Sequence, residues 1–518
     1  MTTTSHPVSG DAPRGRGTHR DATTAPNIAL EEQTLFEISR PGASGAALPP
    51  LDVPELPLAE KAASLVRQQA ARLPELSEPE VVRHFTRLST WNYAIDLGLY
   101  PLGSCTMKYN PRVNEAIARS AAICEAHPYD PAQWTQGHLR IMYELAEDLR
   151  NVTGMPGVCL MPAAGAQGEF AGLLLIARYH AAKGNQKTTI ITTDSAHGTN
   201  PASAALAGFR IIQVPTGPNG YVEVGDIEAV LDNNVAALML TNPNTLGIFE
   251  RNIPKIADML HARDALLYVD GANLNAILGL VRPGDFGADV MQFNLHKTFS
   301  TPHGGGGPGS GPIAVSERLL PFLPAPSVKK DAEDRYALDW SGAGKGDRLG
   351  RVKVFYGNFG MFIRAWVYIR ALGSEGLHAV SENAVLNANY LKARLRNKLH
   401  LPVDGNNLHE VVFNDKNTRD KGFDTGMLAK RLIDYGFHPP TVYFPLCVRN
   451  ALMIEPTESE SLRELDRFVG AVEEILAEMD ESLASDKPVP FRVPRTKVDE
   501  VKAARQLRLT HFSPRSAT

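Results

Sequence analysis

The sequence has little of what marks secreted, metal-binding or membrane-spanning proteins. Its 518 residues include four cysteines, no two of which form a C-x-x-C pair, and this argues against a disulfide framework and a zinc site. The fifteen histidines form no H-x3-H or H-E-x-x-H pattern, so we expect no metal centre. No apolar run reaches about 18 residues, the length that suggests a membrane-spanning helix.

The sequence also has little excess of either charge. The formal net charge is −4, and acidic and basic residues are interspersed along the chain. This balance gives no indication of binding to nucleic acid or to an anionic membrane surface. We therefore expect partners that are neither nucleic acids nor membranes.

The first thirty residues lack the apolar segment of a secretory signal. They contain arginines and few acids, as organelle targeting peptides do, but their Gly, Pro, Ser and Thr content is more typical of a disordered tail. The widely separated cysteines indicate a reducing compartment.

Hydrophobic patterning divides the chain into five stretches. Residues 1–50 should be poorly ordered. Residues 51–150 should hold helices, among them LAEKAASLVRQQAARL and PEVVRHFTRLST, and the unusual loop GSCTMKYNP. Residues 151–350 alternate short apolar runs with helical patterns, which predicts a large domain. Residues 351–482 begin with a long helix and continue as a smaller α+β domain, and 483–518 form a charged tail.

The large domain is predicted to contain a mostly parallel sheet. The runs TTIITT, RIIQVPT, AALMLTN, ALLYVD, DVMQFNL and GPIAVS are apolar and β-branched, as in strands covered by helices on both faces. The fold class is therefore α/β. In such sheets ligands bind beyond the carboxyl ends of the strands, so the residues there are candidates for a site.

Polar or charged side chains follow four of these runs. Each one alone is more often a turn former, a helix cap or a solvated charge, but together at one edge of a sheet they favour a binding site. They are His197, Asn242, Asp270 with Asn273, and His296 with Lys297.

Lys297 and Asp270 are the two protein groups that pyridoxal phosphate (PLP) needs most. A lysine amine can form a Schiff base with the PLP aldehyde, and a carboxylate can keep the pyridine nitrogen protonated. His197 could lie against the ring face. Asn242 and Asn273 could donate hydrogen bonds to the phenolate oxygen. We therefore predict that PLP is the cofactor, with Lys297, His197 and Asp270 as catalytic residues.

The PLP phosphate requires backbone N–H groups, which the start of a helix provides. The segment AAGAQGEFAGLLLIARYH offers Gly165 and Ala166 at a helix start, with Gln167 as a side-chain donor. His296 could add another contact. An ordinary strand-to-helix turn is the alternative interpretation of this segment.

The glycine run GGGGPG fits G-x-G-x-x-G only because nearly every residue in it is glycine. It precedes a strand rather than a helix, so we reject a nucleotide-binding loop. SGAGKGD lacks the Ser or Thr that a phosphate-binding P-loop places after its lysine. We expect the glycines to leave space for a bulky partner beside Lys297.

Taken together, the segments YPLGSCTMKYNP, AAGAQGEFAG, SAHGTNPASA, LTNPNTLGIFE, YVDGANLNAI, FNLHKTFSTPHGGGGPGSGP and ALMIEPTESES resemble one family. This is the P protein of the glycine cleavage system, glycine dehydrogenase (decarboxylating), and more narrowly subunit 2 of its two-subunit form, which bears PLP. The resemblance implies a fold-type-I PLP architecture with a seven-stranded sheet and a small C-terminal domain. It leaves the N-terminal extension, roughly the first 25 residues, unmatched.

The resemblance also implies a reaction and partners. The family decarboxylates glycine and transfers the aminomethyl group to the lipoyl-lysine disulfide of the H protein, as an oxidoreductase. The length implies a separate subunit 1, in a heterotetramer with two copies of each subunit. A cytoplasmic location of the bacterial type follows, rather than organelle targeting.

Several alternatives remain open at this stage. Another fold-type-I PLP enzyme for a small amino acid, such as a decarboxylase, hydroxymethyltransferase or aminotransferase, would use the same cofactor residues. A non-catalytic partner subunit is a third possibility, which the presence of Lys297 disfavours. The group that binds the glycine carboxylate is not identified. The acid or base near the lipoyl sulfur could be His197, His303 or Lys297.

Overall fold

The structure is a computed structural model of the whole chain. It describes residues 32–54, 61–69, 71–303, 309–342, 348–479, 483, 489–490, 493, 498–507 and 509–512. The chain forms two compact units, one made of residues 1–93 with 492–518 and the other of residues 94–491. The predicted domain boundaries stay predictions. Residues 1–50 are predicted to be poorly ordered, and the first 31 of them lie outside the described part of the chain.

The smaller unit brings segments from both ends of the sequence together. Its helices are α1 (Leu35–Ile38), α3 (Glu78–Ser89) and α16 (Glu500–Arg505). Helix α3 starts with a capping box, in which the Ser77 and Glu80 side chains each bond the backbone of the other. Phe36 of α1 stacks on His511, with ring centroids 4.6 Å apart.

The helix predicted for LAEKAASLVRQQAARL is largely absent where the structure describes that segment, in which Lys61 alone is helical. Residues 62–69 form turns and bends. Leu65 is 86% exposed. Because most helical stability in proteins comes from packing an apolar face, a helical pattern with no surface to cover it does not fold as a helix.

The larger unit is built on a seven-stranded sheet in the order β1-β7-β6-β5-β4-β2-β3. Strands β2 to β6 run parallel, whereas β7 is antiparallel to both β6 and β1. This confirms the predicted α/β class with a mostly parallel sheet. The strands are β1 (Gly157–Cys159), β2 (Thr189–Thr193), β3 (Arg210–Val214), β4 (Val235–Thr241), β5 (Leu266–Asp270), β6 (Val290–Gln292) and β7 (Ile313–Val315).

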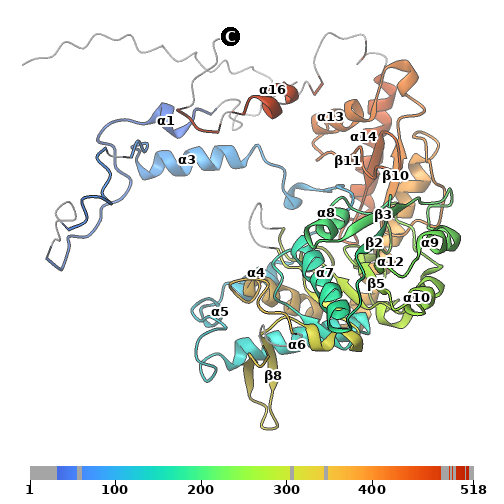
Figure 1. Cartoon of the computed structure of the whole chain (residues 1–518). Coiled ribbons are helices and arrows are strands. Elements are labelled where there is room, and N and C mark those ends of the chain that lie inside the picture. Colours follow the sequence, from blue (N-terminus) through green and yellow to red (C-terminus); the bar gives the residue numbers. More distant parts are fainter. Residues whose placement is uncertain are drawn as a thin grey trace, which may run out of the picture. The chain divides into compact units, whose positions relative to one another are not determined.

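Helices cover the sheet and leave its central strands buried. The crossover helices are α7 (Gly165–Ala182), α8 (Thr199–Leu206), α9 (Val224–Val230) and α10 (Ile253–His261). Helix α7 packs against β4, β5, β6 and β7 (Figure 1). Two glycines allow this close approach. A side chain on Gly168 would come within 2.6 Å of the Gly311 carbonyl oxygen, and one on Gly172 within 2.6 Å of the Tyr268 ring.

Shorter elements and a long helix complete the surroundings of the sheet. The segment before the sheet contains η1 (Ile95–Leu97), α4 (Arg112–Ala118), α5 (Ala121–Cys124) and α6 (Gln136–Thr153). Between and after the strands come η2 (Leu274–Ala276), η3 (Pro283–Phe286), α11 (Leu295–Thr298), η4 (Glu317–Phe322) and the hairpin β8 (Ser327–Lys330) and β9 (Tyr336–Asp339). Helix α12 (Phe359–Leu395) is interrupted at Gly373, whose φ is 62°.

A smaller antiparallel sheet follows α12, as the sequence predicts for this region. Its order is β10-β12-β11, from β10 (Val411–Asn414), β12 (Ala451–Ile454) and β11 (Thr441–Val442). Around it lie η5 (Arg419–Lys421), α13 (Thr425–Asp434) and α14 (Leu462–Ala477). Its core includes Phe413, Phe468 and Leu391, all fully buried.

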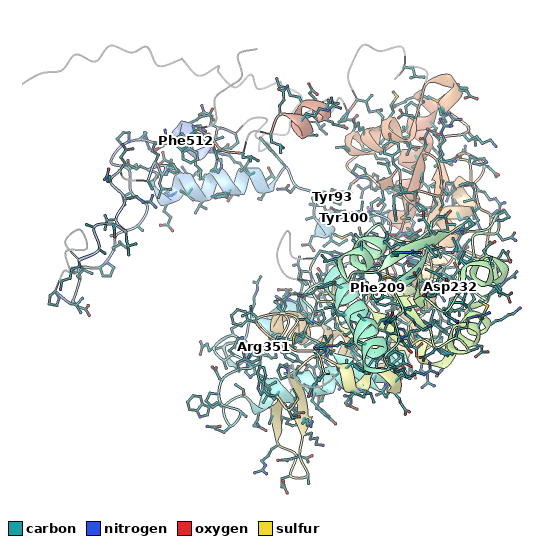
Figure 2. All side chains as sticks on the ribbon, in the orientation of Figure 1. Tyr93, Tyr100, Phe209, Asp232, Arg351 and Phe512 are labelled. Atoms are coloured by element: carbon teal, nitrogen blue, oxygen red, sulfur yellow. The ribbon has the colours of Figure 1, made fainter. Side chains whose placement is uncertain are left out.

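Side chains fill the space between the sheets and their helices, and Phe209 at the start of β3 is one of them (Figure 2). The core of the large sheet is a single cluster that runs from Leu139 of α6 to Val380 of α12. All four cysteines have free thiols. Among the described residues, no helix has the length and apolar character to cross a membrane.

Candidate active site

Lys297 lies on the one-turn helix α11, five residues after β6 ends. Its Nζ donates a hydrogen bond of 2.6 Å to the backbone carbonyl of Ser104, which belongs to the GSCTMKYNP loop. Ser104 and Thr106 both have a positive φ, 60° and 50°. Non-glycine residues seldom adopt this conformation, and it concentrates at functional sites. The loop therefore reaches the candidate site in a strained form.

Asp270 is the last residue of β5 and is almost completely buried. Its Oδ2 accepts a hydrogen bond of 2.9 Å from Asn200 Nδ2, and its Oδ1 accepts one of 3.0 Å from the Ala272 amide. The side chain of Gln292, at the end of the neighbouring β6, also donates to Oδ1. Three N–H donors thus fix the orientation of this carboxylate.

Glu169 is a second buried acid beside Asp270, and the sequence reasoning missed it. Burial raises the pKa of Glu169 to about 7, and the charge of Asp270 also raises it. The hydroxyls of Thr199 and Ser203 donate to its two oxygens, at 2.8 and 3.2 Å. A glutamate inside the apolar helix pattern QGEFAGLLLI was the available signal.

His197 lies near both Asp270 and Lys297, whose charges affect its pKa. Its ring is reached by solvent but sits among many protein atoms, so desolvation lowers its pKa; the charge of Asp270 raises that pKa and the charge of Lys297 lowers it. Nδ1 is 2.8 Å from the Thr199 hydroxyl. The structure therefore brings His197, Asp270 and Lys297 into one neighbourhood, although their roles stay predictions.

Asn242 and Asn273 lie beside Asp270 with different hydrogen bonds. The Asn242 amide donates to the Asp270 carbonyl at 3.3 Å, and Asn242 Oδ1 accepts from the Glu250 amide at 3.0 Å. Within the described residues, Asn242 Nδ2 is buried without a partner and remains available to donate. Asn273 Nδ2 donates to the Pro243 carbonyl at 2.9 Å. One of the two Nδ2 hydrogens of Asn273 is thus used within the protein, and the other can serve as a donor toward a ligand.

Helix α7 begins at Gly165, after Ala164, which has no polar side chain to cap the helix. The N–H groups of Gly165, Ala166 and Gln167 consequently have no partner inside the helix and suit an anion. A side chain on Gly165 would overlap Asn294 Oδ1. The glycine therefore lets the Asn294 side chain lie directly against the helix start.

Gln167 supports this helix start from the side. Its Oε1 accepts from the Ala163 amide, and its Nε2 donates to the Val352 carbonyl, both at 2.7 Å. Its side chain therefore holds the loop before α7. Close by, Ser310 Oγ is buried and has no partner among the residues that the structure describes.

His296 lies beside the glycine-rich segment, of which residues 304–308 are outside the described part of the chain. Its Nδ1 accepts from the Ser310 amide at 3.3 Å. Burial and the charges of His303 and Lys297 lower the pKa of His296 to about 3, so the ring is neutral. A neutral His296 can contact a phosphate as a hydrogen-bond donor, and it adds no charge.

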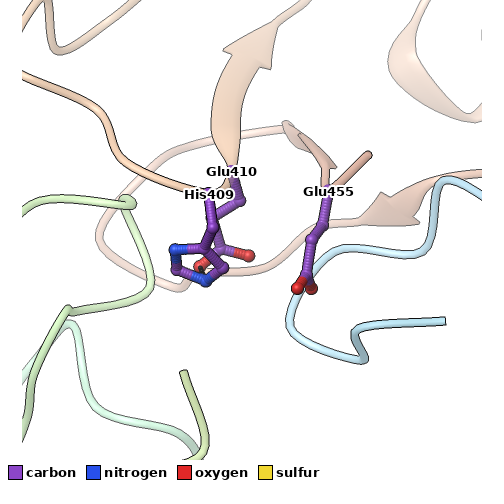
Figure 3. Close-up of side chains that lie close together, drawn as sticks. All are labelled: His409, Glu410 and Glu455. Carbon is purple, nitrogen blue, oxygen red and sulfur yellow. Dashed lines mark ion pairs between the residues drawn. The ribbon is translucent and has the colours of Figure 1, made fainter. Parts of the chain in front are cut away.

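A further cluster near Lys297 was not found from the sequence. His409, Glu410 and Glu455 are fully buried, and one ring nitrogen or carboxylate oxygen of each lies within 4.8 Å of those of the other two (Figure 3). His409 and Glu410 precede β10, whereas Glu455 follows β12, and these two strands pair in the small sheet. Because Glu455 is distant in sequence from the adjacent residues His409 and Glu410, no spacing rule could identify the group.

These side chains fit the chemistry of PLP. The site contains a lysine amine, a buried carboxylate at a neighbouring strand end, an imidazole near both charges and a helix start whose first N–H groups have no partner inside the helix. The unpartnered Ser310 hydroxyl and Asn242 amide are further donors, suited to phosphate and phenolate oxygens. A PLP molecule requires this set of groups.

Comparison with solved structures identifies the fold. An inhibitor-bound glycine decarboxylase (P-protein) of the glycine cleavage system has a TM-score of 0.68 and 22% identity, over 81% of this chain and 94% of that one. A sphingosine-1-phosphate lyase of Burkholderia pseudomallei has a TM-score of 0.59 and 16% identity, over 83% of this chain and 96% of that one. The architecture is that of fold-type-I PLP enzymes, as predicted.

Sequence comparison identifies the family. The family model described as glycine cleavage system P-protein matches residues 52–434, and that of the glycine dehydrogenase C-terminal domain matches residues 380–490. A Chlorobium chlorochromatii protein named probable glycine dehydrogenase (decarboxylating) subunit 2 is 52% identical over 92% of this chain and 99% of its own length. A protein of the same name from Halalkalibacterium halodurans is 50% identical over 92% of this chain and 97% of its own length. The chain therefore belongs to the P-protein family of the glycine cleavage system, together with the proteins named glycine dehydrogenase (decarboxylating) subunit 2.

Proposed function

We propose that this chain is the PLP-bearing subunit of a two-subunit glycine dehydrogenase (decarboxylating). It removes carbon dioxide from glycine and transfers the aminomethyl group to the lipoyl-lysine disulfide of an H protein. The observation that carries the proposal is the grouping of Lys297, Asp270 and His197 at one edge of the sheet, in a chain that matches subunit 2 relatives over almost their whole length.

Four parts of the chain would hold the cofactor. Lys297 would bind the PLP aldehyde, Asp270 would face the ring nitrogen, His197 would lie on the ring and the start of α7 at Gly165 would hold the phosphate. When bound, PLP supplies an electron sink for the pair of electrons left by the departing carboxylate.

The protein's own groups prepare this site in advance. Asn200 and Gln292 hold the Asp270 carboxylate in place, so little reorganisation is needed when charge develops beside it. Glu169, with a pKa of about 7, can carry a proton next to Asp270 and limit the negative charge there. A neutral His197 can pack flat against an aromatic ring without adding a charge.

The proposal includes partners. The name subunit 2 of the relatives supports a second subunit, which we propose to form a heterotetramer with two copies of this chain. The lipoylated H protein and glycine are the proposed partner and substrate. The cytoplasmic location stays a prediction.

The direct test combines chemistry and mass spectrometry. After reduction with borohydride, the PLP adduct should be found on Lys297, and the Lys297→Ala variant should carry none. Lys330→Ala supplies the control, because that lysine pairs with Asp334 at the surface. With subunit 1 and lipoylated H protein, the wild type should exchange labelled carbon dioxide with glycine. Exchange with glutamate but not with glycine, or an adduct on another lysine, would contradict the proposal.

A further inference from the structure

The cluster of His409, Glu410 and Glu455 places two carboxyl groups in a fully buried position (Figure 3). Glu455 accepts hydrogen bonds from the Thr106 amide at 2.9 Å and the Thr106 hydroxyl at 2.6 Å. Glu410 Oε2 accepts from the Ser104 amide at 2.9 Å. Both acids therefore hold the loop that also contacts Lys297.

Part of the cluster has no hydrogen-bond partner. Among the described residues, Glu410 Oε1 and both ring nitrogens of His409 are buried without one. The nearest approach is 3.5 Å, between His409 Nε2 and Glu410 Oε1. An unpartnered carboxylate oxygen in this setting is costly, and a proton on it relieves the cost.

The charges around the two carboxyl groups support the presence of one proton on the pair. Lys297 is a cation close enough to lower the pKa of both acids, but burial outweighs it. Burial and the charge of Glu455 raise the pKa of Glu410 well above its usual range, and burial also raises the pKa of Glu455. His409 adds no positive charge, because burial and the charge of Lys297 lower its pKa to about 3. If both carboxyl groups were ionised, the single positive charge of Lys297 would leave one negative charge uncompensated.

The other titratable groups that face the pair are neutral. Burial raises the pKa of the Cys105 thiol, and the two acids raise it further against the effect of Lys297. Burial also lowers the pKa of His303, whose ring contacts the Cys105 carbonyl at 2.9 Å. Neither group supplies a second positive charge.

We propose that Glu410 and Glu455 share one proton, so that the pair presents a single negative charge to Lys297 and positions the Ser104 carbonyl that Lys297 contacts. The role of this charge in glycine decarboxylation rests on the proposed function, whereas the shared proton does not. Two buried carboxyls with oxygens within 4.8 Å of each other keep one proton as a pair, because both cannot ionise cheaply. Glu410 and Glu455 are positioning residues, since they act through Lys297 and the loop.

The first test measures the charge felt by Lys297. The visible absorbance of Lys297-linked PLP is titrated with pH in the wild type and in E410Q, E455Q and the double variant E410Q/E455Q. Each single variant should titrate like the wild type, because the remaining glutamate ionises and keeps one negative charge. The double variant has no such charge, and its midpoint should fall by about one to three pH units. Glu460→Gln, in the same loop as Glu455, supplies the control.

The second test needs no PLP. The infrared spectrum of the cofactor-free protein should contain a protonated-carboxyl component that each single Gln variant loses in the difference from wild type, while the separate component of Glu169 remains. If the double variant does not fold, this measurement on the single variants still tests the shared proton. If the protein does not link PLP but this component is lost in both single variants, the shared proton is upheld and only the proposed function is contradicted.

Three results would overturn the inference. Equal and additive midpoint shifts in the two single variants would mean that both acids are ionised. An unchanged midpoint in the double variant would mean that their charge does not reach Lys297. A divalent metal found at one equivalent in the wild type, and lost in both single variants, would replace the proton by a cation.

Discussion

The amine of Lys297 donates a 2.6 Å hydrogen bond to the carbonyl of Ser104, a residue 193 positions earlier in the chain. The Ser104 amide, in turn, donates to Glu410 of the small domain region. The backbone of one residue, Ser104, thus links the candidate cofactor lysine to an acid that lies beyond the large sheet in the sequence, directly before β10. Changes in the small sheet should therefore be measurable at Lys297.

Asp270→Ala should leave a folded protein that decarboxylates glycine slowly. We expect a rate lower by roughly a thousandfold, or about 4 kcal/mol of barrier, because the cofactor nitrogen loses its carboxylate partner. Carbon dioxide exchange with labelled glycine measures this rate. Asp232→Ala, at an exposed position before β4, is the matched control (Figure 2). A near-normal rate for Asp270→Ala would remove the proposed role of this carboxylate.

Lys108→Met should destabilise the larger unit. Lys108 Nζ is buried and donates to Glu458 at 2.6 Å, to the Thr298 carbonyl at 2.8 Å and to Tyr368 at 3.1 Å. Removing one partner of a buried pair leaves a carboxylate uncompensated, at a cost of about 3 kcal/mol. Denaturant unfolding measures the loss.

The exposed pair of Lys330 and Asp334 provides the comparison for Lys108. Lys330→Met should cost less than about 1 kcal/mol, because solvent screens surface ion pairs. The double variant K108M/E458Q should recover part of the stability that K108M loses. Equal losses at both lysines would show that burial does not strengthen the Lys108 pair.

Gly311→Ala should disturb the start of α7. A side chain there would overlap the Ala164 carbonyl oxygen, so the backbone before Gly165 must move. We expect a stability loss of about 1–3 kcal/mol and weaker PLP binding, measured by equilibrium titration of the absorbance. Gly225→Ala, in helix α9 with no atom within 4 Å of the added carbon, should bind PLP normally. Unchanged affinity in Gly311→Ala would argue that this helix start does not hold the phosphate.

Glu169→Gln should change how stability depends on pH. A carboxyl whose pKa is about 7 in the folded protein, against a usual value of 4.5, binds more protons folded than unfolded between these values. The free energy of unfolding therefore falls as pH rises through that window. The variant lacks this decrease. The difference in the free energy of unfolding, variant minus wild type, should therefore rise by up to about 3 kcal/mol between pH 4.5 and pH 7.

Unfolding curves at a series of pH values measure the effect of Glu169→Gln. Glu333→Gln changes a glutamate that is 67% exposed and serves as the control. A difference from wild type that stays constant with pH would mean that Glu169 is ionised in the folded protein.

The strands of the large sheet were predictable one by one. Five apolar runs correspond to parallel strands, because β-branched residues and a length of four to eight are local properties of the chain. Strand β1 (Gly157–Cys159) was not among the predicted runs. The antiparallel direction of β7 was not read from its run either, because direction depends on the connection that precedes a strand.

The sequence by itself determined the α/β class and placed Lys297, Asp270 and His197 together, because the carboxyl ends of parallel strands meet at one edge of a sheet. It also carried the family resemblance. Only the tertiary structure decided that Glu169 lies against Asp270 and that Glu410 and Glu455 converge on the loop at Ser104. Those contacts join separately folded elements across long sequence distances, and no local period or spacing encodes the packing that brings them together.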